Sequence, residues 1–309
     1  MVEISQLFPI IPNYLQYCFF YFFGFFIFYL LYIYIFPKND MDEKIYVIQE
    51  NAQEIIKTNK KKYKNETSQM PSINKFYIVI GLGGVGSKVV MNLIRAGVKK
   101  IKVIDYDLVT LSSLNRHSFA KRTDVGKFKA DLIKEYCIEA RPDIIIESID
   151  EPLLENNMEN ILLKEKPDVI IDCIDDLNTK AELYIFCYLK KLKLFSSMGA
   201  AGKCDPTTIR YSKFDEIRGD ILSKRLRNLI RKKMKEKFGF DFLPNFDCVY
   251  SFAKIERDLA ELDEEKKQNI EQIKINFNER IRSLPVFACM PSSFGHCLSA
   301  LSIQKNENS

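Results

Sequence analysis

Two things are missing from the 309 residues of this chain: tryptophan, and any pair of cysteines spaced as CxxC. Structural zinc sites are commonly built from such pairs, so the sequence argues against bound zinc. Cysteines scattered through an α/β protein are typical of buried free thiols in a reducing compartment, not of a disulfide framework. The eight cysteines are Cys18, Cys137, Cys173, Cys187, Cys204, Cys248, Cys289 and Cys297.

Charged residues are absent from Tyr14–Phe36, which consists almost wholly of Phe, Tyr, Ile and Leu. As a helix this segment would span about 34 Å, enough to cross the apolar core of a bilayer. The residues before it include Glu3 but no Lys or Arg, which is unlike a secretory signal peptide. Lysines gather on its C-terminal side, so the positive-inside rule places the rest of the chain in the cytosol. We expect residues 1–37 to form a single-pass membrane anchor; a true start at Met41 would instead give a purely soluble protein.

The most informative segment is Phe76–Asp107, FYIVIGLGGVGSKVVMNLIRAGVKKIKVIDYD. Its pattern predicts a strand, a glycine-rich turn, a helix ended by Gly97, and a second strand. In such a βαβ unit the glycines let the backbone approach a phosphate, which the helix N-terminus faces with unpaired N–H groups. Asp105 follows at about the spacing at which an acidic residue meets a ribose hydroxyl, and Asp107 closes the segment. A nucleotide site is expected here, the alternative being a tight turn without a ligand. The glycines are Gly81, Gly83, Gly84 and Gly86.

Strands and helices alternate up to about residue 212, which predicts a Rossmann-like α/β fold with a mostly parallel, doubly wound sheet. The expected organisation is a membrane anchor (1–37), a polar tether (38–71), a nucleotide-binding domain (72–212), and a basic helical extension with the C-terminal segment (213–309). Further strands are expected at Ile144–Ile149, Val169–Asp172, Lys193–Ser197 and Thr208–Ser212, and further helices at Lys127–Ala140, Glu155–Lys164 and Thr179–Lys190.

Residues downstream of the glycine loop distinguish ATP from NAD. An enzyme that attacks the α-phosphate of ATP with a carboxylate needs cations on the triphosphate and an acidic residue for Mg²⁺. Arg116 and Lys129 meet the first need and Asp175 the second. Hydride transfer needs a nicotinamide pocket instead. Taken singly, the three have ordinary explanations as a loop arginine, a solvated lysine and a helix cap. Together, and in this order, they favour ATP.

The motifs GLGGVGS, IDYD, SLNRH, DVGxxK and DCIDD, in this order and spacing, resemble the ThiF-like adenylating domain of the ubiquitin-activating superfamily. That group includes the molybdopterin and thiamine sulfur-carrier activators, many of which have a zinc site built from CxxC pairs. Within it, Leu111–Ser118 (LSSLNRHS) and Ser196–Thr207 (SSMGAAGKCDPT) are similar to the tRNA threonylcarbamoyladenosine dehydratases, especially the membrane-anchored eukaryotic members. The resemblance covers about Lys75–Ser212 and returns at Leu284–Ala300.

This resemblance implies an enzyme that uses ATP to activate the threonyl carboxylate of N6-threonylcarbamoyladenosine, the modified base beside the tRNA anticodon. Loss of water then closes that group into a cyclic form. The resemblance also implies a homodimer, a Mg²⁺ ion and, from the anchored members, the mitochondrial outer membrane. By position, the four glycines would line the phosphates and Asp105 would bind the ribose. Asp107 is also expected among the residues that bind the cofactor. Asn115, Arg116 and Lys129 would contact the triphosphate, Asp175 would hold the magnesium, and Arg116, Lys129 and Asp175 would carry the catalysis.

The chain departs from the family pattern in three places. Members usually carry an arginine upstream of the glycine loop that reaches the partner subunit's ATP, whereas the first arginine here is Arg95, within the helix of the loop itself. Lys57 or Lys60 would be the substitute, although lysine lacks the planar fork of arginine. Cys204 stands where relatives have other residues, and the C-terminus is expected to be shorter than in the anchored members.

Three other functions remain as alternatives. Activation of a ubiquitin-like or sulfur-carrier protein would use the same adenylation chemistry, but would need a downstream catalytic cysteine or a carrier-binding domain. A non-catalytic, membrane-tethered nucleotide-binding module would fit the missing upstream arginine. An NAD-dependent oxidoreductase fits the glycine loop and little else.

A basic helix is expected at Ile217–Gly239. The formal net charge of +5 does not by itself indicate a nucleic-acid partner, but the cations gather on this segment. They face away from an expected apolar stripe of Ile221, Leu222, Leu226, Leu229 and Ile230. A solvated surface helix is one interpretation; a surface that follows tRNA phosphates is the other. The residues expected to bind tRNA are Arg225, Arg227, Arg231 and Lys232.

Overall fold

The computed structural model describes residues 74–255 and 286–307. The expected anchor Tyr14–Phe36, the expected tether and residues 256–285 of the expected extension lie outside the described residues. Every described residue belongs to one compact unit, Thr67–Ser309. Among the described residues, no helix is both long and apolar enough to cross a membrane.

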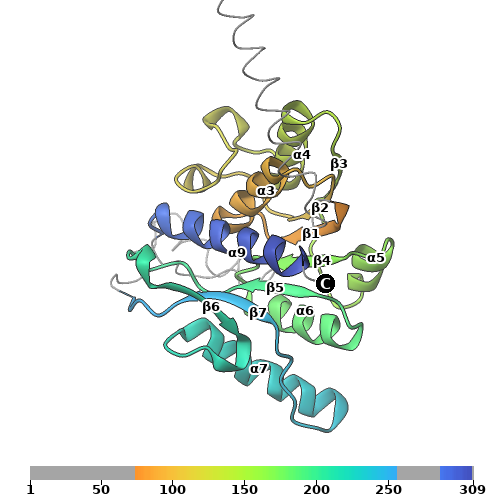
Figure 1. The fold of residues 1–309 in the computed structure, drawn as a ribbon, viewed down its shortest axis with the longest axis vertical. Coiled ribbons are helices and arrows are strands. Elements are labelled where there is room, and N and C mark those ends of the chain that lie inside the picture. Colours follow the sequence, from red (N-terminus) through yellow and green to blue (C-terminus); the bar gives the residue numbers. More distant parts are fainter. Residues whose placement is uncertain (1–73, 256–285, 308–309) are drawn as a thin grey trace, which may run out of the picture. The chain divides into compact units, whose positions relative to one another are not determined.

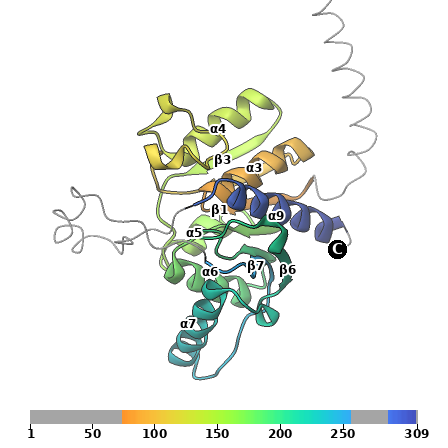
Figure 2. The same cartoon turned by 90° about the vertical axis from the view of Figure 1, so that its left-hand side faces the viewer.

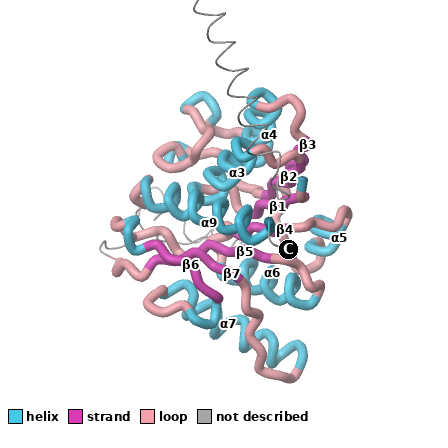
Figure 3. The backbone as a smooth tube through the Cα atoms, in the orientation of Figure 1, coloured by secondary structure: helices cyan, strands magenta, loops and turns pink. Residues whose placement is uncertain are grey.

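A seven-stranded sheet forms the centre of this unit, with strand order β3-β2-β1-β4-β5-β7-β6. All neighbouring strands run parallel except the last pair, in which β6 is antiparallel to β7. Figure 3 shows the strands of this sheet in magenta. The predicted Rossmann-like, mostly parallel fold is therefore confirmed. The strands are β1 (Phe76–Ile80), β2 (Lys100–Ile104), β3 (Ile145–Ile149), β4 (Val169–Asp172), β5 (Leu194–Ser197), β6 (Ile209–Lys213) and β7 (Asp247–Ser251).

Helices cover both faces of the sheet (Figures 1 and 2). One apolar core lies under α3, α4 and α9, and a second lies under α5, α6 and α7. The central strand β4 is buried on both faces, as its continuous apolar sequence predicts. The helices are α3 (Gly84–Ala96), α4 (Lys129–Ala140), α5 (Met158–Leu163), α6 (Leu177–Leu189), α7 (Ile221–Phe238) and α9 (Cys289–Glu307).

The sheet and its cores do not end at residue 212, where the sequence analysis placed the end of the nucleotide-binding domain. Strand β7 lies between β5 and β6, so the sheet depends on a segment from the expected extension. Helix α9 runs alongside α3, and its Gly295 permits the approach, because a Cβ there would stand 2.7 Å from the Cβ of Lys88. Farther along, Asn92 of α3 donates to Ser299 of α9 at 2.9 Å. The two helices therefore run parallel, with their N-termini side by side.

Helix α7 buries a different stripe from the one expected. Ile221 is 53% exposed, because Asp220 caps the helix and Ile221 only begins it. The stripe that packs against the sheet and α6 recurs every three or four residues from the second turn onward, as one helical face requires. Its buried members are Ser223, Leu226, Ile230 and Met234.

The direction of strand addition reverses between β1 and β4, since β2 and β3 extend the sheet on one side and β4 and β5 on the other. In open α/β sheets, ligands bind at the carboxyl ends of strands at such a switch point. Gly81 follows β1 and Cys173 follows β4 at this place. The topology thus positions a site where the glycine loop begins.

Candidate functional site

The four glycines of the loop between β1 and α3 have different surroundings. Gly81 has φ +82°, and a Cβ there would stand 2.8 Å from the backbone of Cys173. A Cβ on Gly86 would lie 1.8 Å from the carbonyl oxygen of Gly81, so Gly81 and Gly86 are required by the fold of the loop itself. A Cβ on Gly83 would meet nothing within 4 Å. Gly83 is also the N-cap of α3, so open space lies beside the start of the helix.

Asp105, at the end of β2, holds the glycine loop in place. One carboxylate oxygen accepts the backbone N–H of Leu82 at 2.6 Å, and the other accepts that of Asp107 at 2.8 Å. Burial raises the pKa of this carboxyl, and the positive charge of Lys129 opposes the shift. Each oxygen has a second lone pair, so the carboxylate can still accept a hydroxyl from a ligand.

Lys129 begins α4 and reaches back to the end of β2. Its Nζ lies 2.6 Å from a carboxylate oxygen of Asp107, and its backbone N–H donates to the carbonyl of the same residue at 3.0 Å. The lysine side chain is 11% exposed and the aspartate 52%. A nearly buried ammonium group is thus held next to a carboxylate that remains open to solvent.

Arg116 and Asn115 lie on the turn that faces the start of α3. The Nη1 of Arg116 donates to the carbonyl of Ser112 at 2.5 Å and to Oδ1 of Asn115 at 2.9 Å. Burial lowers the pKa of Arg116, and the charge of Asp175 opposes that shift. A Cβ on Gly84 would stand 3.2 Å from the Cβ of Arg116. The guanidinium has five N–H donors, so these two bonds leave donors for an anion at the loop.

His117, next to Arg116, is buried and neutral. Its Nδ1 accepts the backbone N–H of Ala120 at 3.1 Å and that of Phe119 at 3.3 Å. Burial first, and then the charge of Lys129, lower the pKa of the ring to about 4. His117 therefore orders the turn that carries Arg116 without adding a charge to it.

The loop that carries Asp175 is held by a buried ion pair. Asp172, the last residue of β4, lies 2.6 Å from the Nζ of Lys180, and both side chains are fully buried. The same carboxylate accepts the hydroxyl of Ser196 at 2.7 Å, and Lys180 also donates to the carbonyl of Ile174 at 2.9 Å. Asp175 itself is exposed at the mouth of the site.

Carboxylates outnumber cations at this mouth. Tyr106, which is 52% exposed, has its pKa raised by partial burial and then by four carboxylates around it. Those four are Asp107, Asp105, Asp176 and Asp175. Against them stand Arg116 and Lys129. Such a surplus of negative charge suits a triphosphate only when a divalent cation binds with it.

The structure thus brings together the glycine loop, Asp105, Asp107, Lys129 and Arg116, with Asp175 close enough to influence Arg116. The four residues expected to bind tRNA lie apart from this site on α7, which belongs to the opposite face of the sheet. One of them, Arg227, is used internally, because its Nη1 donates to the carbonyl of Phe214 at 2.9 Å.

Comparison with known proteins identifies the family. The family model of ThiF matches residues 63–266. The chain belongs to the ThiF family. It is 36% identical over 228 residues to tRNA threonylcarbamoyladenosine dehydratase 2 of Saccharomyces cerevisiae, a match that covers 72% of this chain and 49% of the relative. It is 31% identical over 179 residues to the Escherichia coli tRNA threonylcarbamoyladenosine dehydratase, covering 56% of this chain and 64% of the relative. This ThiF-family chain spans about half the length of the yeast relatives it matches.

Solved structures share the fold of this ThiF domain. The E. coli tRNA N6-threonylcarbamoyladenosine dehydratase TcdA, solved in complex with ATP, has a TM-score of 0.64 and 23% identity. That match covers 80% of this chain and 90% of the TcdA chain. The likeness shows that the two chains share a fold.

Sequence reasoning missed three groups around the ThiF site. Lys180 was overlooked because one lysine in an apolar helix resembles a solvated residue, and its partner Asp172 lies at the end of the preceding strand. Pro291, in the first turn of α9, lies against the loop, since a Cβ on Gly84 would stand 2.9 Å from its Cβ.

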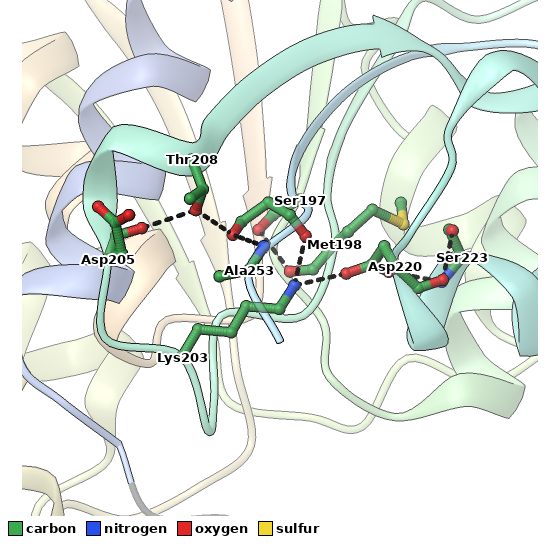
Figure 4. Close-up of polar contacts among 9 residues, drawn as sticks. Ser197, Met198, Lys203, Asp205, Thr208, Asp220, Ser223 and Ala253 are labelled. Atoms are coloured by element: carbon green, nitrogen blue, oxygen red, sulfur yellow. Dashed lines mark hydrogen bonds and ion pairs between the residues drawn. The ribbon is translucent and has the colours of Figure 1, made fainter. Parts of the chain in front are cut away.

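The third group is the buried pair Lys203 and Asp220 (Figure 4). The Nζ of Lys203 lies 2.7 Å from Oδ2 of Asp220 and donates to the carbonyl of Ser251 at 2.7 Å. Asp220 also caps α7 by accepting the N–H of Ser223 at 2.8 Å. The loop after β5, the end of β7 and the start of α7 therefore meet at one point.

Proposed function

We propose that the chain is an ATP-dependent dehydratase that cyclises N6-threonylcarbamoyladenosine in tRNA. The observation that carries the proposal is the convergence of Arg116, Lys129 and Asp175 on the glycine loop at the switch point of the sheet. The yeast and E. coli relatives named as tRNA threonylcarbamoyladenosine dehydratases support the choice of substrate. The TcdA structure with bound ATP supports the choice of nucleotide.

The proposed reaction has two steps. An oxygen of the threonyl carboxylate attacks the α-phosphorus of ATP, and the bond to pyrophosphate breaks, giving a carboxyl adenylate. A nucleophilic atom of the neighbouring carbamoyl group then attacks the activated carbonyl carbon, and AMP leaves with the former carboxylate oxygen. ATP thus removes the elements of water from the base, and the protein supplies positioning and charge stabilisation.

Different residues of the site bind different parts of ATP. The N–H groups at the start of α3, behind Gly83, face the phosphates. Arg116 stabilises the negative charge that develops on the α-phosphate, and Lys129, held by Asp107, contributes a second positive charge. Asp105, fixed by the backbone N–H of Leu82, accepts a ribose hydroxyl.

A magnesium ion fits this set of residues. Mg²⁺ is usually bound through one or two carboxylates together with substrate phosphates and water. Asp175 is an exposed carboxylate at the mouth of the site, and the surplus of acidic residues there favours a divalent cation. When bound, the ion would neutralise the phosphates; Asp175 would hold it, and Arg116 would orient the reacting phosphate.

Three proposals concern the whole protein and follow from the sequence: a membrane anchor, the membrane it enters, and a homodimer. Tyr14–Phe36 anchors the chain in a membrane with the ThiF domain in the cytosol, as its length and lack of charge favour. The family resemblance favours the mitochondrial outer membrane and a homodimer. Carbonate extraction tests the anchor: the protein should stay in the membrane pellet, and release of full-length protein would contradict it.

Calorimetry with ATP-Mg and with NAD on the purified full chain tests the choice of nucleotide. ATP-Mg should bind and NAD should not; micromolar NAD binding without ATP binding would refute the proposal. Arg116→Ala should weaken ATP binding or raise the reaction barrier by about 1.5–3 kcal/mol, the contribution of a hydrogen bond to a charged group. Arg95→Ala, an exposed arginine in the last turn of α3, is the matched control and should change neither.

A further inference from the structure

Helix α7 exposes a continuous stripe of positive charge. At 100° per residue, five cations fall within one third of the helix circumference, opposite the buried face of Ser223, Leu226, Ile230 and Met234. They extend over about 16 Å of helix axis at 1.5 Å per residue. The five, named here the α7 stripe, are Lys224, Arg225, Arg231, Lys232 and Lys235.

The α7 stripe differs from the other cations of the same helix. Lys233 and Lys237 reach Glu182 of α6 at 2.6 and 2.8 Å, so they are neutralised where the two helices pack. Arg227 donates to the carbonyl of Phe214 and its guanidinium lies over the ring of the same residue. Within residues 74–255 and 286–307, by contrast, no ion pair is formed by Lys224, Arg225 or Lys235.

The remaining two stripe residues make only distant contacts. The Nε of Arg231 is 3.7 Å from Asp241, and the Nζ of Lys232 is 3.9 Å from Glu236. All four side chains are more than half exposed, and ion pairs between exposed side chains contribute little to the stability of the fold. The α7 stripe is therefore a row of charges that the fold itself does not use.

Helix α7 starts at the carboxyl edge of the sheet, the edge at which the nucleotide site also lies. Asp220, which caps α7, is joined through Lys203 to the loop that follows β5 and to the carbonyl of Ser251 at the end of β7 (Figure 4). Strand β5 is the neighbour of β4, whose carboxyl end leads to Asp175. The helix thus begins at the edge of the sheet that carries the ATP residues and runs away from it along α6.

We infer that the α7 stripe binds the phosphate backbone of the RNA substrate and holds the strand whose modified base enters the site. This inference rests on the proposed function, which supplies an RNA substrate. Backbone contacts fix register without reading bases, and a base must be splayed from its loop to reach the site, so a row of cations on a helix that starts at the same edge of the sheet suits the task.

RNA is favoured over a membrane as the occupant by the packing of α7. An amphipathic helix that binds a bilayer inserts its apolar face, but here that face is occupied by α6 and the sheet. The helix can therefore meet a partner only through its charged side. For a protein whose proposed substrate is an RNA, the partner recognised by charge alone is the nucleic-acid backbone.

The test compares two triple variants of the full chain. In the first, Lys224, Arg225 and Lys235 are replaced by Gln. In the control, Lys99→Gln, Lys164→Gln and Lys166→Gln remove the same charge from exposed lysines at the opposite, amino edge of the sheet. The probe is a tRNA anticodon stem–loop that carries N6-threonylcarbamoyladenosine, and its binding is followed by fluorescence anisotropy over a salt series.

The stripe variant should lose at least about tenfold in affinity for the stem–loop, and the slope of log affinity against log salt should fall by about 0.7–0.9 for each contact removed. The control should keep both values, and all three proteins should bind ATP equally. Equal losses in the two variants, or unchanged RNA binding in the stripe variant, overturn the inference. So does a stripe variant that keeps RNA binding but loses binding to vesicles containing phosphatidylserine. A wild-type chain that binds the RNA but not ATP refutes the proposed function and leaves the RNA comparison intact.

Discussion

At the scale of single residues, the glycine loop separates structural positions from those left open to a ligand. The sequence predicts a phosphate loop from four glycines, but it cannot tell that Gly81 and Gly86 are needed for close approach within the protein. That distinction depends on backbone atoms from β1 and from the residue after β4, which are distant in sequence. Gly83 alone of the four faces empty space.

Two alanine substitutions should therefore behave differently. Gly86→Ala places a Cβ 1.8 Å from a carbonyl oxygen, so the backbone must move, and we expect a loss of about 3 kcal/mol or more of unfolding free energy. Gly83→Ala should change stability by less than about 1 kcal/mol, yet weaken ATP binding because the methyl group occupies the space in front of α3. Urea unfolding and calorimetry measure both; equal stability of the two variants would contradict this account of the loop.

His117 should make stability depend on pH. Its folded-state pKa of about 4 lies below the ordinary value of 6.5, so the unfolded chain binds more protons between these two pH values. The contribution of the neutral ring is complete above pH 6.5 and is lost as the pH falls toward 4, by up to about 3 kcal/mol. His117→Asn keeps an acceptor for the backbone N–H groups without a titrating ring. Urea unfolding at several pH values should show that the variant loses less unfolding free energy than the wild type as the pH falls from 6.5 to about 4. Identical pH profiles of the two proteins would show that the pKa of His117 is not lowered by folding.

At the scale of elements, the sequence predicts regular βα units well and elements held by distant partners poorly. Val169–Asp172 was predicted to the residue, because an apolar run between polar segments is specific for a buried parallel strand. Helix α9 was missed because it contains Pro291 and Gly295, which disfavour a helix locally. Its stability comes from α3, and Gly295 is what allows that contact. Strand β7 follows a loop of about eight residues and belongs to the sheet only through β5 and β6.

The start of α7 should depend on the ion pair beneath it. Lys203→Met leaves the carboxylate of Asp220 buried without its partner, which should cost about 3–5 kcal/mol of unfolding free energy. Adding Asp220→Asn should recover most of that loss, because asparagine still caps a helix and carries no charge. Chemical denaturation of the single and double variants measures both effects. If the unfolding free energy of Lys203→Met alone lies within about 1 kcal/mol of the wild-type value, the ion pair does not anchor the helix.

At the scale of the whole molecule, the fold assembles one site from five separate segments of the chain. The loop after β1, the end of β2, the Arg116 turn, the start of α4 and the loop after β4 meet at the switch point of the sheet. Their motifs could be recognised in the sequence because the spacing of the residues carries the family resemblance. The bonds that hold them, such as Lys180 to Asp172, depend on the fold and were not predictable.

The most direct test of the central claim is mass analysis of nucleosides after the purified full chain acts on tRNA. The substrate is a tRNA that carries N6-threonylcarbamoyladenosine, and ATP-Mg is supplied. We predict that the base loses the mass of one water and that AMP appears in equal amount, while Asp175→Asn forms little of either. A modified base that remains unchanged with the wild-type chain, in the presence of demonstrated ATP binding, would contradict the account.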